Sequence, residues 1–533
     1  MGGIRGFAGG KYHMEDASSK ERPLVDKRTR RAIMIGLALG MLMACLDGTI
    51  ISTAIKTIIE DFNGYTEYSW VITGFMLCET IMIPLGGKLS DQYGRKPVFM
   101  AGIAIFLAGS ILSGLSQNMT QLIAFRAIQG LGGGILIPVA TASVADLYSP
   151  SERGKMQGAL GSLFAVAMCV GPFLGGFITD HISWHWIFFI NVPIGAVALV
   201  FVLKKFPKPV IEGVVRVDYL GMGVLSAFIL DLLLFFTWVG VDFEWASVET
   251  AAMMAVAAGL LALLIKIEFR AADPVIRPGL FRNRMFICCA LTMLIFGLAM
   301  MGCMTYIAIF MQAVIGISAT NTGTIMLPMV AGLMITSMVS GFSASRTGYR
   351  PWLIAGPIIS ALGMYLLSTL AAGSDTTIAI LYLFITGLGL GCVMSIVMIA
   401  TQNSSKPGEM GMTTSAVNLF RSIGSTVAVG VFTTIVNGRI ASELAAHLPE
   451  GWIGIIPNTT GAMNYLTSPD IPDMVKGVIL DAYSSGVTFS FFCAAVVVLC
   501  LLAMAVFMKG KPARETKASP TAADPPEDGA DGF

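Results

Sequence analysis

The chain has 533 residues, of which 55% are hydrophobic and 13% charged, and its formal net charge is +1. Soluble domains carry about 25% charged residues, so this composition excludes an ordinary soluble protein and predicts one embedded in a lipid bilayer. A net charge so close to zero gives no support for nucleic acid as a partner. Fourteen apolar runs of about 20 residues are each long enough to cross the bilayer as a helix. The expected fold class is therefore an all-α membrane protein.

The fourteen predicted spans form two six-helix bundles with two additional transmembrane helices between them. The spans are 32–54, 68–88, 97–116, 121–144, 156–179, 184–203, 218–238, 250–267, 286–312, 322–343, 352–370, 376–398, 411–436 and 485–507. The predicted parts are a cytoplasmic N-terminal segment (1–31), the first bundle (32–204), a linker with the inserted pair (205–285), the second bundle (286–508) and a disordered cytoplasmic tail (509–533). Residues 437–483 are expected to form a solvated outer loop. Lys and Arg gather on one side of this arrangement, which predicts a cell-membrane protein with both termini in the cytoplasm.

The first two spans each contain an acid. Asp47 lies in an otherwise apolar stretch of the first span, and Glu79 lies near the middle of the second. Burial in hydrocarbon disfavours the charged form of a carboxyl group, so such an acid can take up and release protons. We expect both acids to act as proton or cation sites. The alternatives are that Asp47 only pairs with a neighbouring helix or meets water in a vestibule, and that Glu79 is a protonated structural residue.

A charged turn follows the second span. It carries two glycines, an acid and two bases: Gly87, Gly94, Asp91, Arg95 and Lys96. The acid can cap the N-terminus of a neighbouring helix while the bases pair with acids, so the turn is predicted to be a cytoplasmic latch that opens and closes. The pattern G-x6-G-x-[RK]-P recurs at 341–351, which indicates a weak internal repeat. In many transporters the substrate site lies between such paired halves, near the midplane of the membrane.

The fourth span contains Arg126. At 1.5 Å per helical residue, Arg126 and Asp47 both lie about 8 to 11 Å below the outer surface. We expect Arg126 to favour the ionised form of Asp47 in one conformation and to release it in another. Gln129, one turn from Arg126, either extends this network and the substrate cavity or makes a packing hydrogen bond. In the thirteenth span, Asn418 and Arg421 share one helical face and are polar candidates for the same cavity.

The fifth span contains three glycines and a proline, namely Gly171, Pro172, Gly175 and Gly176. Glycine permits close helix contact and proline removes a backbone hydrogen bond, so this segment is predicted to be either a packing surface or a pliable hinge. The nine cysteines lie in apolar spans, and no Cys or His spacing is typical of a metal site. We therefore expect no metal and no cofactor. No constellation of nucleophile and base indicates an enzyme.

Several of these motifs resemble those of the major facilitator superfamily. The pattern G-x-L-S-D-x-x-G-R-K at 87–96 resembles its cytoplasmic signature, and R-x-x-Q-G at 126–130 resembles its fourth-helix motif. The pattern G-P-x-x-G-G at 171–176 resembles the fifth-helix motif associated with antiporters. L-D-x-T-I at 46–50 and W-x-W-I-F-F-I-N-V-P-I-G at 184–195 are similar to the fourteen-helix drug/proton antiporter branch.

The resemblance implies a proton-coupled antiporter that exports lipophilic drugs by alternating access, with cations among the candidate substrates. One alternative keeps the transporter and changes the cargo to an endogenous metabolite, such as a lipid, peptide or siderophore. Another, from a different class, is a non-transporting membrane receptor, although a latch would have little purpose in a static protein. The expected partners are a small lipophilic molecule and protons, and a monomer is favoured.

Overall fold

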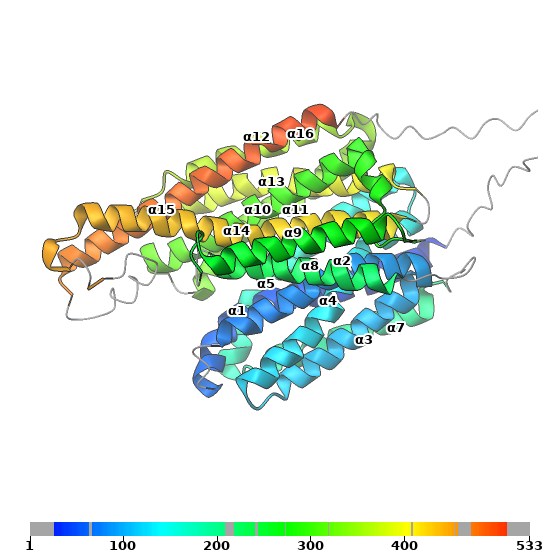
Figure 1. Ribbon diagram of the computed structural model, residues 1–533, viewed down its shortest axis with the longest axis horizontal. Helices are drawn as coiled ribbons and strands as arrows, with labels where there is room; N and C mark the ends of the chain where they lie inside the picture. Colours follow the sequence, from blue (N-terminus) through cyan, green and yellow to red (C-terminus); the bar gives the residue numbers. More distant parts are fainter. Residues whose placement is uncertain are drawn as a thin grey trace, which may run out of the picture.

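The computed structural model describes residues 26–62, 67–207, 218–239, 243–271, 273–317, 319–371, 373–406, 409–452, 455–456 and 471–508, in which the regular structure is helical (Figure 1). The first helices are α1 Lys27–Phe62, α2 Tyr68–Tyr93, α3 Arg95–Gly114, α4 Met119–Leu147, α5 Pro150–His181, α6 Trp186–Phe189 and α7 Asn191–Lys205. The inserted pair is α8 Tyr219–Trp238 and α9 Val248–Glu268. The remaining helices are η1 Pro278–Arg282, α10 Arg284–Ile309, η2 Phe310–Val314, α11 Ala319–Thr347, α12 Arg350–Leu367, α13 Thr376–Ser404, α14 Met410–His447, η3 Glu450–Trp452, α15 Asp473–Leu499 and α16 Leu501–Phe507.

The number of membrane-crossing helices agrees with the sequence. Thirteen helical segments in the described part of the chain are long and apolar enough to cross a membrane. The helix α5 is not among these thirteen, but its 32 residues make it about 48 Å long and it packs along α1 and α11. With α5 the set is the predicted fourteen. Helices suit a bilayer because every backbone N–H and C=O in hydrocarbon needs a partner within the chain. The predicted all-helical membrane fold is confirmed.

The long helices form two packed bodies, which we name the N-half (α1–α7) and the C-half (α10–α16). One apolar cluster of the N-half joins α1 to α3, α4 and α7 through side chains such as Leu37, Phe99, Leu136 and Val202. A larger cluster fills the C-half, where side chains from α10 to α16 meet. The residue boundaries of the predicted parts stay a prediction.

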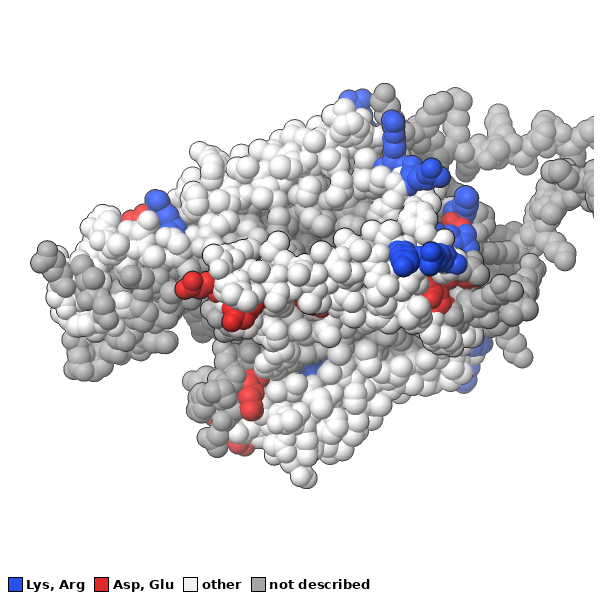
Figure 2. Space-filling view, in the orientation of Figure 1, with Lys and Arg blue, Asp and Glu red and all other residues white. Residues whose placement is uncertain are grey.

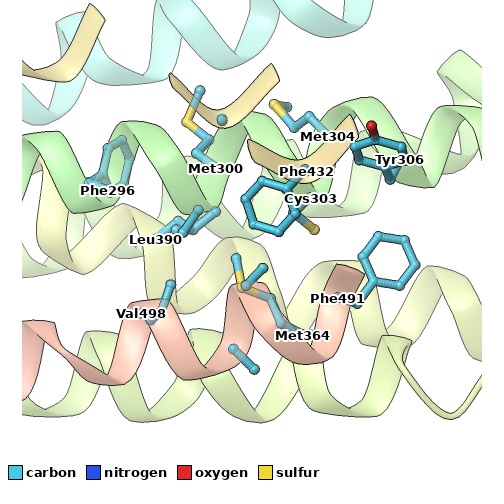
Figure 3. Close-up of a cluster of buried hydrophobic side chains, with 14 of the residues drawn as sticks. Phe296, Met300, Cys303, Met304, Tyr306, Met364, Leu390, Phe432, Phe491 and Val498 are labelled. Atoms are coloured by element: carbon cyan, nitrogen blue, oxygen red, sulfur yellow. The ribbon is translucent and has the colours of Figure 1, made fainter. Parts of the chain in front are cut away.

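Aromatic and sulfur-containing side chains fill the C-half core (Figure 3). Phe432 of α14 points toward α10, where a Cβ on Gly302 would lie 2.5 Å from the Phe432 ring. Met300 and Cys303 of α10 belong to the same cluster. Flexible methionines fill the irregular space beside rigid rings, so the core packs without matching shapes at every contact.

The inserted pair lies along the seam between the two halves (Figure 1). Ile229 and Leu233 of α8 share an apolar cluster with Leu77 of α2 and Leu419 of α14. The helix α8 therefore contacts both halves on one side of the molecule, and α9 packs against α8.

Charge is distributed unevenly along the helix axes. Most Lys and Arg side chains visible in Figure 2 lie at one end of the molecule, on the right, which we name the basic end. The C-termini of α2 and α4 lie at this end, and so do the N-termini of α5 and α14. The two halves meet at the basic end and diverge toward the opposite end (Figure 1).

Residues 437–483 do not form a simple loop as expected. The helix α14 continues to His447, and α15 begins at Asp473. Glu443 lies 2.9 Å from Arg439 and 3.5 Å from His447, and such i,i+4 pairs stabilise the added turns. These turns are polar, so hydropathy alone could not indicate them. The expected N-terminal segment and tail fall largely on residues 1–25 and 509–533, outside the described residues.

Candidate functional site

A buried polar network surrounds Asp47 in the N-half. Arg126 of α4 donates a hydrogen bond from Nη1 to Asp47 Oδ2. Gln129 Nε2 donates to Asp47 Oδ1 at 2.7 Å, and Asn191 Nδ2 of α7 donates to the same oxygen at 3.2 Å. All four residues are at most 1% exposed. Three donors from two helices thus hold one carboxylate away from solvent.

The Arg126 side chain is held as firmly as its partner. Nη1 also donates to Gln129 Oε1 at 2.8 Å, and Nε donates to the Val71 carbonyl at 3.4 Å. The guanidinium lies 4.1 Å from the centroid of the Phe75 ring. Removing one partner of a buried ion pair leaves the other charge uncompensated and destabilises a protein by about 3–5 kcal/mol. The Asp47–Arg126 pair therefore requires both members.

The structure brings together the two residues that the sequence predicted to lie at the same depth in the membrane. Asp47 and Arg126, which the sequence places at equal depth, are in direct contact. Gln129, a candidate for both the network and the cavity, lies in the network and is fully buried. Sequence reasoning missed Asn191. Its signal was an amide side chain within an apolar run at the start of α7.

The second acid, Glu79, lies on α2 where the N-half faces the C-half. Its carboxylate and the Arg421 guanidinium of α14 act on each other electrostatically across the interface. One residue further along each helix, the Thr80 and Ser422 hydroxyls are hydrogen-bonded at 2.8 Å. Glu79 and Arg421 are therefore opposite charges carried by different halves.

A small cavity of about 20 Å³ lies between the halves near Arg421. Its polar lining comes from both sides and includes Thr141, Gln157, Ser337, Ser395, Asn418 and Arg421. Met41, Met394 and Met398 supply part of its apolar lining. A cavity of this volume has room for water, since about 10–15 Å³ suffices. Asn418 and Arg421 thus line this cavity and Gln129 does not, and a role for any of the three in binding substrate stays a prediction.

The predicted latch joins α2 to the N-terminus of α14 at the basic end. Asp91 Oδ1 accepts a hydrogen bond from the Gly411 backbone N–H at 2.9 Å, and Oδ2 accepts one from Met412 at 2.7 Å. The free N–H groups and the dipole at a helix N-terminus favour an anion there. Asp91 of the N-half therefore caps a helix of the C-half.

Glycine is required at the two latch positions for different reasons. Gly94 has φ = +89° between α2 and α3, a left-handed conformation that favours glycine. Gly87 lies where α2 crosses α14, and a Cβ there would collide with Ser415 and with the Gly411 carbonyl. Glycine at 87 thus allows the two backbones to approach closely enough for Asp91 to reach the α14 N-terminus.

The two latch bases act within the N-half. Arg95 lies 2.6 Å from Asp91 Oδ1 and donates from Nε to Asp146 Oδ2 of α4 at 2.8 Å. Lys96 Nζ donates to the carbonyls of Leu203 and Phe206 at 2.8 and 3.0 Å, where α7 ends. Arg95 therefore orients Asp91 and ties α2 to α4, whereas Lys96 caps the C-terminus of α7.

The glycine segment of α5 packs on α1. A Cβ on Gly171 would collide with Thr49, and a Cβ on Gly175 would collide with Thr53 and with the Ile50 carbonyl. The helix α5 is continuous through this segment, and Gly176 is half-buried. The side chain of Pro172 lies outside the described part. Close packing at these glycines places α5 directly against the helix that carries Asp47.

A second contact closes the basic end on the side of α5 and α11. The backbone of Gly154 lies against that of Gly341, so a Cβ on either would collide with the carbonyl of the other. Arg153 Nη1 donates to Asn403 Oδ1 of α13 at 3.0 Å, and Gln402 Nε2 donates to the Thr141 carbonyl at 2.8 Å. The five hydrogen bonds between the halves that are described above lie at Thr80–Ser422 or nearer to the basic end.

These groups suit ion exchange and conformational change better than covalent chemistry. Among the described residues, no group of three or more His, Cys, Asp or Glu side chains is placed to hold a metal ion. The candidate site instead combines a sealed ion pair, a second pair of charges across the interface and a closed end secured by helix capping.

Known proteins resemble most of the chain. The profile described as Major Facilitator Superfamily matches residues 37–429. "Multidrug transporter protein MdtP" of Bacillus subtilis (strain 168) is 36% identical over 423 residues, covering 79% of this chain and 78% of the relative. "Multidrug resistance protein 3" of the same organism is 34% identical over 501 residues, covering 92% of this chain and 97% of the relative.

Solved structures resemble the fold at low sequence identity. The proton:xylose symporter XylE matches with a TM-score of 0.58 at 12% identity, over 90% of this chain and 95% of the symporter. The human organic anion transporter MFSD10 matches with a TM-score of 0.57 at 14% identity, over 91% of this chain and 100% of that transporter. The profile match and the two bacterial relatives confirm the resemblance read from the motifs: the chain belongs to the major facilitator superfamily and is a multi-pass membrane transporter, not an enzyme.

Proposed function

We propose that this transporter is a proton-coupled antiporter that exports lipophilic drugs by alternating access, with cations among its substrates. The positive-inside rule favours a cytoplasmic location for the basic end and for both termini. In that orientation the halves are closed toward the cytoplasm and diverge toward the outside, as an exporter requires when it releases substrate. The names of the two bacterial relatives support drugs as the cargo.

The observation that carries the proposal is the placement of the two membrane acids. Asp47 is sealed within the N-half by Arg126 and its other donors. Glu79 instead lies at the interface, beside the Thr80–Ser422 hydrogen bond that brings α2 against α14 next to Arg421. The distance between Glu79 and Arg421 changes when the halves reorient, and the balance between the ionised and protonated forms of Glu79 changes with it. Proton binding at Glu79 is thereby coupled to the direction in which the cavity opens.

Asp47 contributes through the helices that pack around it. The helix α1, which carries Asp47, touches α5 at Gly171 and Gly175. The helix α5 in turn contacts α11 of the C-half at Gly154. A movement of the C-half would therefore reach α1 through α5 and change the distance from Asp47 to Arg126. In this scheme Arg126 holds Asp47 ionised in the described state and releases it in the other state.

The cavity lining supports a lipophilic substrate. Methionines from both halves supply flexible apolar surface that adapts to different shapes. The amide and hydroxyl groups beside them can orient a polar group on the substrate. The latch at Asp91 keeps this cavity closed toward the cytoplasm while substrate leaves.

A liposome assay tests the coupling. Purified protein is reconstituted with an internal pH indicator, and ethidium or a neutral lipophilic dye is added to the wild type, Asp47→Asn and Glu79→Gln. Asp231→Asn is the matched control, because Asp231 is also an acid in a spanning helix, but its helix belongs to the inserted pair. We expect proton movement opposite to substrate movement in the wild type and the control, and its loss in the two test variants.

Other outcomes would redirect the assignment. Dye movement that ignores the proton gradient would contradict antiport. Folded protein that moves none of the dyes would favour an endogenous metabolite as cargo. Unchanged coupling in Glu79→Gln would contradict the assigned role of the interface acid.

A further inference from the structure

The segment that follows the inserted helices contacts both halves at the basic end. We name residues 273–283, between α9 and α10, the connector; it includes η1. Val275 is 1% exposed and lies in the apolar cluster shared by α2, α8, α9 and α14. Leu280 belongs to the core cluster of the C-half. Apolar packing therefore fixes the connector beside the junction of α2 and α14.

One acid ties the connector to the N-half. Asp273 Oδ1 accepts a hydrogen bond from Lys88 Nζ at 2.5 Å, and Oδ2 accepts one from Gln92 Nε2 at 2.8 Å. Lys88 and Gln92 lie four residues apart on one face of α2, on either side of Asp91 in sequence. Lys88 is 5% exposed, so Asp273 neutralises a largely buried charge.

One base ties the connector to the C-half. Arg277 is hydrogen-bonded to Glu409, which immediately precedes α14. Arg277 also lies 3.4 Å from Asp273. Charges thus alternate from Lys88 through Asp273 and Arg277 to Glu409, and the chain of charges runs from the end of α2 to the beginning of α14.

We infer that the connector is a second lock on the cytoplasmic side, in which Asp273 and Arg277 are positioning residues that hold α2 against α14. This inference rests on the proposed alternating access. Opening of the basic end separates Asp91 from the Gly411 and Met412 amides, and the charges that bridge the same gap must then separate as well. The inserted helices acquire a role in this way, because they carry the connector that bears the lock.

The exposure of the two pairs indicates which one opens. The Arg277 side chain is 46% exposed and its partner Glu409 16%, whereas the Lys88 side chain is 6% exposed. Water can replace the partner of the exposed Arg277 charge, so this pair separates at the smaller cost, whereas separating Lys88 from Asp273 would leave a buried charge alone. The connector therefore stays with α2, and the Arg277–Glu409 pair breaks and re-forms in each cycle.

Reversible cross-linking tests this assignment. One variant carries Arg277→Cys and Glu409→Cys, and a matched variant carries Gln92→Cys and Asp273→Cys, both in a background without reactive native cysteines such as exposed Cys500. A reducible thiol-specific cross-linker joins each pair, and ethidium transport in liposomes is measured before cross-linking, after it and after reduction. The first cross-link is expected to stop transport until it is reduced. With the second cross-link in place, the variant is expected to transport at the same rate as it did before cross-linking.

The controls separate failure of this inference from failure of the proposed function. Transport by the uncross-linked proteins that follows the proton gradient supports the proposed function independently of the lock. Full transport with the 277–409 cross-link in place would overturn the lock, and loss of transport with both cross-links would overturn the assignment of Arg277–Glu409 as the pair that opens.

Discussion

Neutralising Asp91 should shift the transporter toward the state that is open at the basic end. In the closed state both carboxylate oxygens accept backbone N–H groups from the first residues of α14, at 2.9 and 2.7 Å. An asparagine at 91 keeps one acceptor oxygen and turns its NH2 group toward the other N–H. Asp91→Asn therefore loses one hydrogen bond and the attraction between a full charge and the α14 dipole.

The size of the shift follows from these two losses. A hydrogen bond to a charged group contributes about 1.5–3 kcal/mol. A charge at a helix N-terminus contributes about 0.3–1 kcal/mol more. Arg95 keeps its 2.8 Å bond to Asp146, so the substitution leaves no uncompensated charge. The total of about 2–4 kcal/mol corresponds to a change of about 30- to 700-fold in the ratio of closed to open molecules.

Energy transfer between single fluorophores measures this ratio. The dyes are placed at Tyr93 and Lys406, which are exposed at the basic end on different halves. Asp375→Asn is the matched control, because Asp375 also caps a helix, accepting the Thr377 N–H at 3.0 Å, but it does so within the C-half. The control should leave the distribution unchanged. An unchanged distribution in Asp91→Asn would refute the assignment of Asp91 as a cap that acts across the interface.

Three further outcomes are expected. Gly154→Leu should prevent closure of the basic end and stop transport, because the new Cβ would collide with the Gly341 carbonyl. Gly223→Leu is the control, since a Cβ there meets nothing within 4 Å. Equal energy-transfer distributions in the two variants would contradict the predicted block of closure. Glu79→Gln should weaken the dependence of transport on pH, because a glutamine side chain cannot take up and release the coupled proton; an unchanged pH profile would oppose the role assigned to Glu79. Burial of Asp273 acts to raise its pKa, but hydrogen bonds from Lys88 and Gln92 outweigh this and hold the pKa below the ordinary value of 3.8. The lock is therefore fully formed above pH 3.8 and weakens only as the pH falls through the lowered pKa of Asp273. Asp273→Asn should change the transport rate but leave the midpoint of the pH dependence of transport where it is. A shifted midpoint would contradict this prediction.

Much of the membrane topology could be predicted because hydrocarbon imposes a strict requirement on each segment. An apolar run of bilayer length must form a helix there, so the spans could be read from the sequence without any tertiary information. The same reasoning fails beyond the bilayer. The last turns of α14 near His447 and the first turns of α15 near Asp473 are polar, and their stability depends on local pairs and packing that hydropathy does not measure.

The sequence predicted how deep the site residues lie in the membrane, but not which helices lie next to each other at that depth. Counting residues gives the depth of Asp47 and Arg126, and two groups at one depth can meet if their helices face each other. Depth does not tell which other helix supplies a donor, and so Asn191 was missed. Asp273 was missed for a related reason. Its partner Lys88 is 185 residues away, and only the packing of the inserted pair across the seam brings them together.

The two sides of the closed basic end differ, although an internal repeat relates them. Charges cross the interface between α2 and α14, at Asp91 and at the connector. Between α5 and α11 the backbones of Gly154 and Gly341 touch, and the repeat has Ser345 where its first copy has Asp91. Charges attract over several ångströms, whereas a gap of about 1 Å already removes up to half of a van der Waals contact. We therefore expect closure to begin between α2 and α14, with the charges drawing the halves together before the glycines touch, and opening to begin between α5 and α11.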